Sequence, residues 1–253
     1  MDIVLGDKEA NLKSVIQVIH EAKRLQADIL VLPELFTTGY FLEKASELAE
    51  KQDGYSINLL RDLASRFHIF LVAGSLLERR GKQIYNTCRL IGKDGRIVGS
   101  YDKIHLFPPF SEDKYLTPGT TLPIFKTDLG VLGVAICFDI RFPELTRSLV
   151  LRGAQVIFVP AEFPAERISI WATLLRARAI ENQVFVVGCN RVGSDGNHSF
   201  GGRSAIIDPE GKALAQAGGS QQIVSAVIDL DRITYVRERL PTLKFRREAL
   251  YRT

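Results

Sequence analysis

The sequence has few cysteines, the residues that stabilise many secreted proteins as disulfides and many small domains as zinc ligands. Its 253 residues include three cysteines, one methionine and one tryptophan. Cys88, Cys137 and Cys189 are odd in number and widely spaced, so they predict neither a disulfide framework nor a zinc site. We therefore expect a cytoplasmic protein that needs no metal.

Long apolar runs and strong charge are missing as well. No run reaches the ~18 residues that a membrane span needs, and the N-terminus lacks the pattern of a signal peptide. The net charge is +4, and basic residues are scattered except near Lys244, Arg246, Arg247 and Arg252. Without a basic stripe or stacking motif, these favour a solvated tail over a nucleic-acid site. We expect no nucleic-acid or membrane partner.

Linkers, low-complexity stretches and repeats are also absent, which predicts a single domain over residues 1–253. With 46% hydrophobic residues, the chain can build one sizeable core. Helices and strands are expected to alternate, as in an α/β layered domain. Apolar spacing predicts helices at 12–19, 57–67, 143–151, 164–181 and 231–239, and strands at 28–32, 70–75, 85–91, 97–103, 131–136, 156–159, 184–189, 204–207, 212–217 and 222–228.

Cys137 is the most informative residue. It follows the strand-like run 131–136, and Pro143 is well placed to open a helix after it. A thiol at such an elbow is half exposed and lies near backbone N–H groups and the positive end of a helix. This setting can lower the pKa of a thiol from its usual ~8.5 and can supply donors to an oxyanion. On position alone, a buried structural cysteine is an equally good interpretation.

Two further residues favour the catalytic interpretation. Glu34 ends an apolar strand, where a partly desolvated carboxylate suits a general base; an ordinary loop carboxylate is the alternative. Lys103 is flanked by Tyr, Ile, Leu and Phe residues, which is not typical of a solvated surface lysine. Its ammonium group could be a cation held near a carboxylate and a developing oxyanion. Alternatively, Lys103 could lie on an edge strand and extend its charged end into solvent.

In this order, the three segments resemble the nitrilase superfamily, the carbon–nitrogen hydrolases, which use a Glu–Lys–Cys triad. Within it the chain is most similar to the ω-amidases, which hydrolyse the terminal amide of 2-oxo acid monoamides such as 2-oxoglutaramate. The stretch 160–164 (PAEFP) and the pair Asn190-Arg191 support that branch. The resemblance covers nearly the whole chain and is carried by residues 33–34 (PE), 101–106 (YDKIHL), 137–144 (CFDIRFPE), 175–183 (LRARAIENQ), 188–193 (GCNRVG) and 202–211 (GRSAIIDPEG).

The resemblance implies a fold and an assembly. The fold is an α-β-β-α sandwich of two stacked mixed sheets with helices outside. Subunits of the family pair through outer helices, so we expect a homodimer or a higher homo-oligomer, with the helices that follow Pro143 and Pro164 at the interface. Members usually start with a full apolar strand ahead of the segment that matches residues 2–7. Met1 lies almost at the end of that strand, so we expect exposed backbone groups or a core gap there.

The resemblance also implies amide hydrolysis through a thioester. Cys137 attacks the amide carbon, Glu34 is the general base, and Lys103 and the backbone N–H of Phe138 stabilise the oxyanion. Glu112 matches a second carboxylate that holds the lysine or positions the substrate; a solvated loop glutamate is the alternative. No cofactor is implied.

Substrate-binding residues are harder to predict. The distal carboxylate of a small-molecule monoamide calls for a cation or a cluster of donors. The candidate cations, each of which could equally be a surface or interface arginine, are Arg141, Arg167 and Arg191. Residues that could line the pocket, or could instead pack and hold turns, are Tyr40, Glu162 and Asn190. The histidines show no metal-ligand spacing, and His105 is interpreted as structural.

Other functions on the same scaffold stay open. A true nitrilase typically has Trp-Glu after its nucleophile, and Phe138-Asp139 here favours amides. A deaminated-glutathione amidase and an N-carbamoyl hydrolase share the triad. A catalytically silent binding protein is the alternative from another class.

Overall fold

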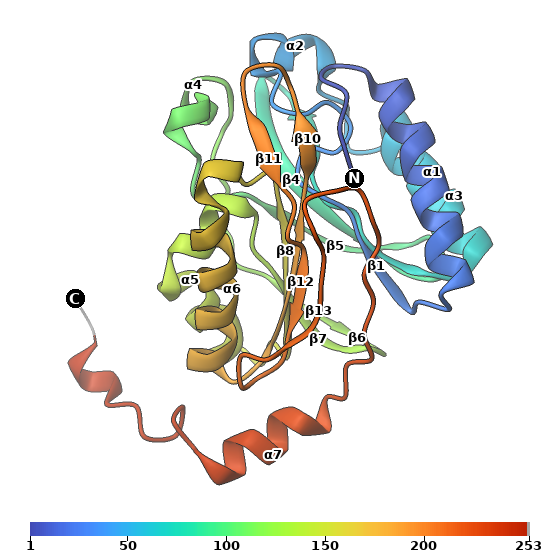
Figure 1. Ribbon diagram of the computed structural model, residues 1–253. Coiled ribbons are helices and arrows are strands. Elements are labelled where there is room, and N and C mark those ends of the chain that lie inside the picture. Colours follow the sequence, from blue (N-terminus) through green and yellow to red (C-terminus); the bar gives the residue numbers. More distant parts are fainter. Residues whose placement is uncertain (252–253) are drawn as a thin grey trace.

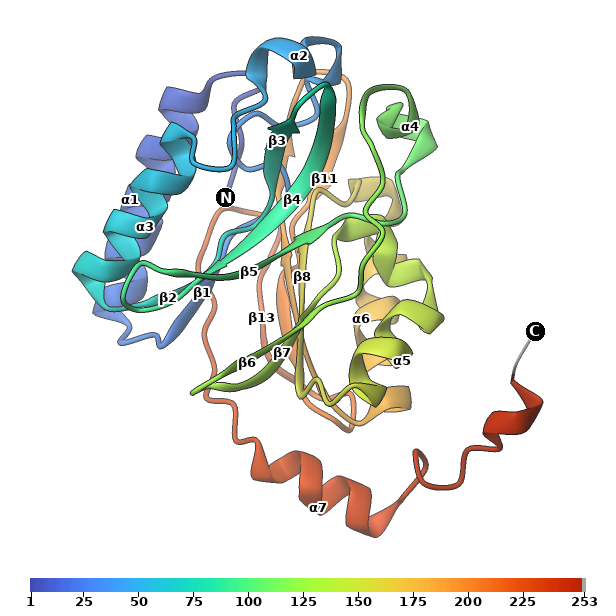
Figure 2. The same ribbon diagram turned by 180° about the vertical axis from the view of Figure 1, so that it is seen from behind.

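Two mixed sheets face each other at the centre of the molecule, and helices cover their outer faces (Figures 1 and 2). The structure is a computed structural model that describes residues 1–251. Helices α1 (Lys8–Arg24) and α3 (Tyr55–Phe67) cover one sheet, and α5 (Pro143–Leu151) and α6 (Ile168–Asn182) cover the other. This confirms the predicted α-β-β-α sandwich.

The first sheet is built around one long strand, β4 (Gln83–Ile91). Its two edges are occupied differently: β2 and β3 pair along one edge, and β5 pairs along the other. Strand β1 is parallel to β2 and lies at the end of the sheet. The other members are β1 (Ile29–Val31), β2 (Phe70–Val72), β3 (Leu76–Arg80) and β5 (Ile97–Asp102).

The second sheet has the strand order β13-β12-β9-β8-β7-β6. Its centre is parallel, because β7, β8 and β9 run in the same direction. The carboxyl ends of these three strands therefore meet at one edge. The strands are β6 (Ile124–Thr127), β7 (Gly130–Val134), β8 (Val156–Ala161), β9 (Phe185–Asn190), β12 (Ala205–Ile207) and β13 (Ala213–Gln216).

The remaining elements are short or peripheral. Helix α7 (Asp231–Arg239) and the segment after it extend away from the sandwich (Figures 1 and 2). Within residues 1–251, no helix is both long and apolar enough to cross a membrane. The short elements are the hairpin β10 (Val192–Ser194) and β11 (Ser199–Gly201), α2 (Ala45–Leu48), α4 (Glu112–Tyr115), and the 3-10 turns η1 (Leu42–Lys44), η2 (Pro108–Phe110), η3 (Cys137–Arg141), η4 (Ala165–Arg167) and η5 (Glu248–Leu250).

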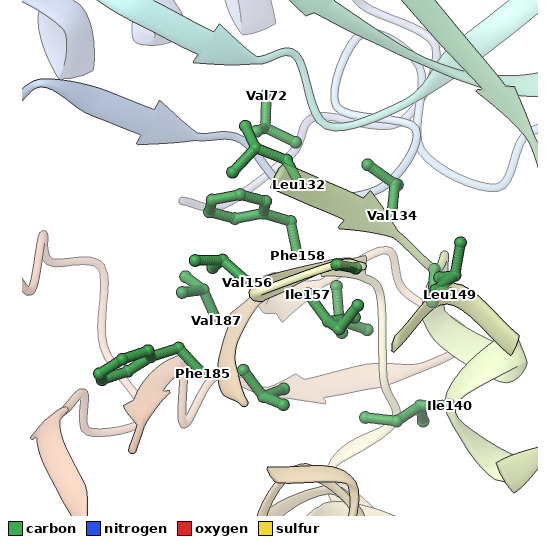
Figure 3. Close-up of a cluster of buried hydrophobic side chains, with 14 of the residues drawn as sticks. Val72, Leu132, Val134, Ile140, Leu149, Val156, Ile157, Phe158, Phe185 and Val187 are labelled. Carbon is green, nitrogen blue, oxygen red and sulfur yellow. The ribbon is translucent and has the colours of Figure 1, made fainter. Parts of the chain in front are cut away.

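The core between the sheets follows the two-residue period of the strands. On β8, Phe158 belongs to the same buried cluster as Val72 of the opposite sheet, and Figure 3 draws these two side chains on one side of the strand. Ile157, one residue earlier, points to the other side, where Ile140 and Leu149 lie (Figure 3). Because neighbouring side chains alternate, β8 is apolar throughout and buries both faces.

A large cavity interrupts this core beside β1. It has a volume of about 900 Å³ and is lined by Met1, by Val31, by Phe158 and by residues 221–228. Residues 222–228 were predicted as a strand, and this prediction is wrong: the segment forms none, and no backbone hydrogen bond joins it to a neighbour within residues 1–251. A strand needs a partner for its N–H and C=O groups, and none lies across the cavity.

Most other elements lie where the sequence places them. The hairpins β4–β5 and β12–β13, helix α7 and the start of α5 at Pro143 are confirmed. The predicted helix from 164 begins as the 3-10 turn η4 and becomes α-helical at Ile168. The expected strand 70–75 ends at Val72.

Candidate active site

The predicted functional residues follow the ends of strands from both sheets. Glu34 lies three residues after β1, Lys103 directly after β5, and Cys137 three residues after β7. Glu162 directly follows β8, and Asn190 ends β9. The β-sandwich thus gathers side chains that are far apart in the sequence at one edge, where ligands commonly bind in α/β proteins.

Lys103 lies between two carboxylates. Its Nζ is 2.8 Å from Oε1 of Glu34 and 2.7 Å from Oε2 of Glu112, and it donates to the hydroxyl of Tyr40 at 3.2 Å. All three charged side chains are fully buried. The lysine therefore has a partner for each of its three protons, and the alternatives of a solvated Glu112 and a snorkelling Lys103 are excluded.

Further donors fix the two carboxylates. Asn86 on β4 donates to Oε1 of Glu34 and to Oε1 of Glu112, both at 3.0 Å. The hydroxyl of Tyr40 donates to Oε1 of Glu34 at 2.8 Å, and the backbone N–H of Glu162 donates to its Oε2 at 2.9 Å. Four groups thus hold the Glu34 carboxylate, counting Lys103, so its orientation is set before any substrate binds.

Electrostatics keep the lysine charged. Burial alone would lower the pKa of Lys103, but the negative charges of Glu112 and Glu34 outweigh burial and raise it. Burial and the charge of Glu34 raise the pKa of Glu112, against the opposing effect of Lys103. One buried cation is thus shared between two buried carboxylates.

Cys137 lies at a strained elbow. Its φ of +47° is in the left-handed region, which L-residues rarely adopt. Such a turn lets a side chain leave the strand direction. The thiol is only 5% exposed, so the expected half-exposed setting is wrong. Cys137 is the first residue of the turn η3, and the helix that starts at Pro143 comes later.

The expected lowering of the thiol pKa is also wrong. Burial and the negative charge of Glu34 raise the pKa of Cys137 well above its ordinary value, and Lys103 only partly compensates. The charges of Glu34, Lys103 and Glu112 all act on the pKa of this thiol. The sulfur is therefore protonated near neutral pH, and it needs a base to become a nucleophile.

A small cavity of about 10 Å³ adjoins Cys137 and is lined by Phe107, Phe138 and Phe163 together with Arg141 and Arg167. This volume takes about one water molecule. The guanidinium of Arg141 lies over the ring of Phe163 at 5.6 Å, and that of Arg167 lies over Phe107 at 5.9 Å. Both candidate cations thus lie at the wall of the space beside the thiol.

The third candidate cation is placed differently. Arg191 is fully buried; its guanidinium pairs with Glu162 at 2.6 Å and donates to the carbonyl of Ile3 at 2.6 Å. It does not line the cavity beside Cys137. Burial raises the pKa of Glu162 to about 8, although Arg191 opposes this shift. Oδ1 of Asn190 accepts a hydrogen bond from the backbone N–H of Phe163 at 2.7 Å, so this side chain fixes the turn after β8.

Sequence reasoning missed two residues of the site. Asn86 is buried in β4, and a polar residue in a largely buried strand was the available signal. Asp139 directly follows Phe138 and is fully buried; it was used only to distinguish amidases from nitrilases. Among the described residues 1–251, no cluster of three or more His, Cys, Asp or Glu side chains is arranged to hold a metal ion.

Comparisons with known proteins identify the family of this chain. A family model described as carbon–nitrogen hydrolase matches residues 1–238. The 2-oxoglutaramate amidase of Bacillus subtilis (strain 168) is 41% identical over 99% of this chain and 96% of its own length. The chain belongs to the carbon–nitrogen hydrolase family. It is therefore an enzyme that hydrolyses carbon–nitrogen bonds other than peptide bonds.

Other members of the carbon–nitrogen hydrolase family extend the likeness. An omega-amidase of Xenopus tropicalis is 35% identical over 96% of this chain and 92% of its own length. The structure of Saccharomyces cerevisiae Nit3, of the nitrilase superfamily, matches with a TM-score of 0.91 at 32% identity, covering 98% and 94% of the two chains. A mutant of the amidase from Nesterenkonia sp. AN1 matches with a TM-score of 0.89 at 27% identity over 99% and 92% of the chains; it carries the acetamide moiety of fluoroacetamide on its active-site cysteine.

Proposed function

We propose that this carbon–nitrogen hydrolase is an ω-amidase, which converts the terminal amide of a small 2-oxo acid monoamide, such as 2-oxoglutaramate, to a carboxylate and ammonia. The observation that carries the proposal is the buried Glu34–Lys103–Glu112 cluster, whose charges act on the pKa of the Cys137 thiol. The amidase activities of the relatives named above support the substrate class.

The first half of the reaction forms a thioester. Glu34 takes the proton of the Cys137 thiol while the sulfur attacks the amide carbon. The amide oxygen gains the negative charge, which Lys103 and the N–H of Phe138 stabilise. Glu34 then gives its proton to the nitrogen, the C–N bond breaks, and ammonia leaves. Because the thiol pKa is raised, proton removal and attack belong to the same step.

The second half hydrolyses the thioester. Glu34 removes a proton from water, the hydroxide attacks the thioester carbon, and Lys103 and Phe138 again stabilise the oxyanion. The C–S bond breaks, and the sulfur recovers a proton from Glu34. One amide and one water thus give one acid and one ammonia. Glu112 holds Lys103 charged throughout.

Lys103 has no unused proton at rest, since Glu34, Glu112 and Tyr40 accept all three. The contact with Tyr40 is the longest of these, at 3.2 Å. The substrate oxygen therefore replaces Tyr40 on Lys103, and the Tyr40 hydroxyl keeps its hydrogen bond to Glu34.

We assign the distal carboxylate of the substrate to Arg141 and Arg167, because they line the cavity beside Cys137. Arg191 is excluded from this role because it is buried and paired with Glu162. Replacing Arg167 by Gln should raise the KM for 2-oxoglutaramate about 10- to 100-fold, as expected for a charge-assisted hydrogen bond of roughly 1.5–3 kcal/mol. The KM for an uncharged amide such as propionamide should hardly change, and Arg24→Gln on α1 is the matched surface control.

Ammonia release across a panel of compounds tests the function. The panel is 2-oxoglutaramate, 2-oxosuccinamate, glutamine, simple nitriles and N-carbamoyl amino acids. Turnover of the 2-oxo acid monoamides should exceed the others, Cys137→Ala should abolish it, and Cys189→Ala should retain it. Preference for a nitrile or an N-carbamoyl compound would reject the ω-amidase assignment, and a folded wild type without any turnover would favour a silent binding protein.

We further propose that the chain is one catalytic domain of the cytoplasm and forms a homodimer through α5 and α6. All three cysteines are free, as a reducing compartment requires. Large apolar side chains on these helices are exposed, with 49% exposure at Leu151, 40% at Ile170 and 52% at Ile180. Sedimentation of wild type and Ile180→Glu tests the interface: the wild type should be dimeric and the variant should dissociate.

A further inference from the structure

The carboxylate of Asp139 joins the segments that carry the nucleophile and the cation. Its Oδ2 accepts the hydroxyl proton of Tyr101 at 2.7 Å and the backbone N–H of Ile136 at 2.9 Å. Its Oδ1 accepts the backbone N–H of His105 at 3.0 Å and lies 2.8 Å from Nδ1 of the same residue. The side chain is fully buried, so these protein groups replace water completely.

These partners are neighbours of the residues that carry the proposed chemistry. Ile136 directly precedes Cys137, whose positive φ needs support from its surroundings. Tyr101 and His105 lie two residues before and two residues after Lys103. One carboxylate therefore connects the elbow of the thiol to both sides of the lysine, although the two segments belong to different sheets.

The imidazole of His105 is held from a second side. Its ring stacks on Phe142 with a centroid distance of 3.6 Å and an interplanar angle of 8°. Phe142 directly follows the turn η3, and its N–H donates to the carbonyl of Asp139 at 3.0 Å. The turn η3 is thus attached to the loop after β5 by two contacts of His105, a charge-assisted hydrogen bond to Asp139 and ring stacking on Phe142.

The geometry points to Asp139 as a positioning residue that sets the distance and orientation of Cys137 relative to Lys103, with His105 as its partner on the lysine side. This inference rests on the roles proposed above for Cys137 and Lys103. Asp139 acts through backbone and side-chain contacts and leaves the reacting atoms to others. A displacement of about 1 Å between reacting groups can reduce a rate about 100-fold, which sets the size of the expected effect.

The variant Asp139→Asn tests this role, because an amide group offers N–H where one carboxylate oxygen accepted hydrogen bonds. We expect kcat for 2-oxoglutaramate to fall about 100-fold while KM changes less than about threefold. Asp208→Asn is the matched control: Asp208 is also a buried aspartate that accepts two backbone N–H groups, but it does so at the β12–β13 turn. Its kcat should stay within about twofold of wild type.

A second readout is independent of the substrate. The rate at which iodoacetamide alkylates Cys137, followed by peptide mass spectrometry, should fall at least about tenfold in Asp139→Asn and should not change in Asp208→Asn. If wild-type protein alkylates normally but hydrolyses no amide, the proposed function fails while the positioning role is still decided by the alkylation rates. Equal alkylation and equal kcat in folded Asp139→Asn and wild type would overturn the positioning role.

Substitutions of the partners decide the matter if Asp139→Asn does not fold. Tyr101→Phe and His105→Ala each remove one contact and should lower kcat about 3- to 10-fold with circular dichroism unchanged. His105→Asn can still donate a side-chain N–H to Oδ1, so it should recover most of the activity that His105→Ala loses. Wild-type kcat in both single variants, or no difference between His105→Asn and His105→Ala, would reject the inference.

Discussion

The protonation state of Cys137 decides how this active site works. Burial and the negative charge of Glu34 raise the pKa of its thiol, and Lys103 does not reverse the effect. In the site without substrate, the Cys137 thiol therefore keeps its proton near neutral pH. In the proposed mechanism, the nucleophile forms only when Glu34 accepts the proton, which ties activation of the sulfur to the presence of a carbon that it can attack.

Replacing Glu34 by Gln should have two opposite effects. Loss of the general base should reduce kcat about 10²- to 10⁴-fold. Loss of its negative charge should lower the pKa of Cys137, because that charge is the largest raising influence after burial. The pH dependence of alkylation by iodoacetamide measures this pKa. A midpoint that stays at the wild-type pH, or moves higher, would contradict the electrostatic account.

The raised pKa of Glu162 predicts that the free energy of unfolding depends on pH. Burial raises its pKa from the ordinary 4.5 to about 8, so between these values the native state keeps a proton that the unfolded chain has lost. The free energy of unfolding should therefore fall as the pH rises from about 5 to 8, by up to about 1.4 kcal/mol per unit from this group. Above pH 8, both states are ionised and this contribution stays constant.

Urea unfolding of wild type and Glu162→Gln between pH 5 and 9 measures this contribution. The variant has no group that titrates at this position, so the difference in free energy between the two proteins should shrink as the pH rises and then level off. Two parallel curves would show that Glu162 is ionised in the native state throughout this range.

At the scale of the elements, the candidate site residues lie at or just after the ends of strands, and helices pack on these strands. Helix α6 packs on β9 through Trp171 and Leu175, which meet the strand at Gly188. A Cβ added at Gly188 would lie 2.6 Å from Cζ2 of Trp171 and 2.7 Å from both Cδ atoms of Leu175. The close approach of helix and strand thus requires glycine at this position.

Gly188→Ala should lower the free energy of unfolding by about 1–3 kcal/mol, the usual range for overpacking a core. Gly218→Ala is the control, because its new Cβ would meet only the end of Gln222, at 3.3 Å. That change should stay within about 0.5 kcal/mol. Chemical denaturation compares the two, and equal midpoints would show that α6 moves outward without loss.

The success of the sequence prediction differs between elements for physical reasons. Pro143 fixes φ and begins a helix locally, and the turn residues at 93–95 and 208–211 close hairpins locally, so these elements were predictable. The segment 222–228 has the composition of a strand, but strands form only against a partner. Composition does not reveal whether a partner is present.

The candidate site divides in the same way. Glu34, Lys103, Cys137 and Glu112 could be chosen from local sequence and family resemblance, and the fold brings them together. The direction of the thiol pKa shift was mispredicted, because it depends on the burial of the side chain and on charges that other strands bring near it. Asp139 was missed as a positioning residue for the same reason: its partners Tyr101 and His105 are 38 and 34 residues away in the sequence.

At the scale of the whole molecule, the cavity beside β1 interrupts the packing of the sandwich. It occupies about 900 Å³ where apolar side chains of both sheets would otherwise pack. Strand β1 pairs only with β2, and residues 221–228 lie along the other side of the cavity without backbone partners within the described chain. Val227, in that segment, is 90% exposed. The gap has the two free edges that an additional strand needs.

Joining seven residues of alternating Val and Thr ahead of Met1 should therefore stabilise the protein. Met1 lines the cavity, and seven residues in a strand reach about 23 Å. The valines bury apolar surface at about 25 cal/mol per Å², and the backbone supplies partners to β1 and to residues 222–228. We expect a rise in Tm of at least about 5 °C, and slower hydrogen exchange at residues 222–228. A Gly/Ser extension of equal length should change neither, and equal Tm values for the two extensions would show that the cavity does not accept a strand.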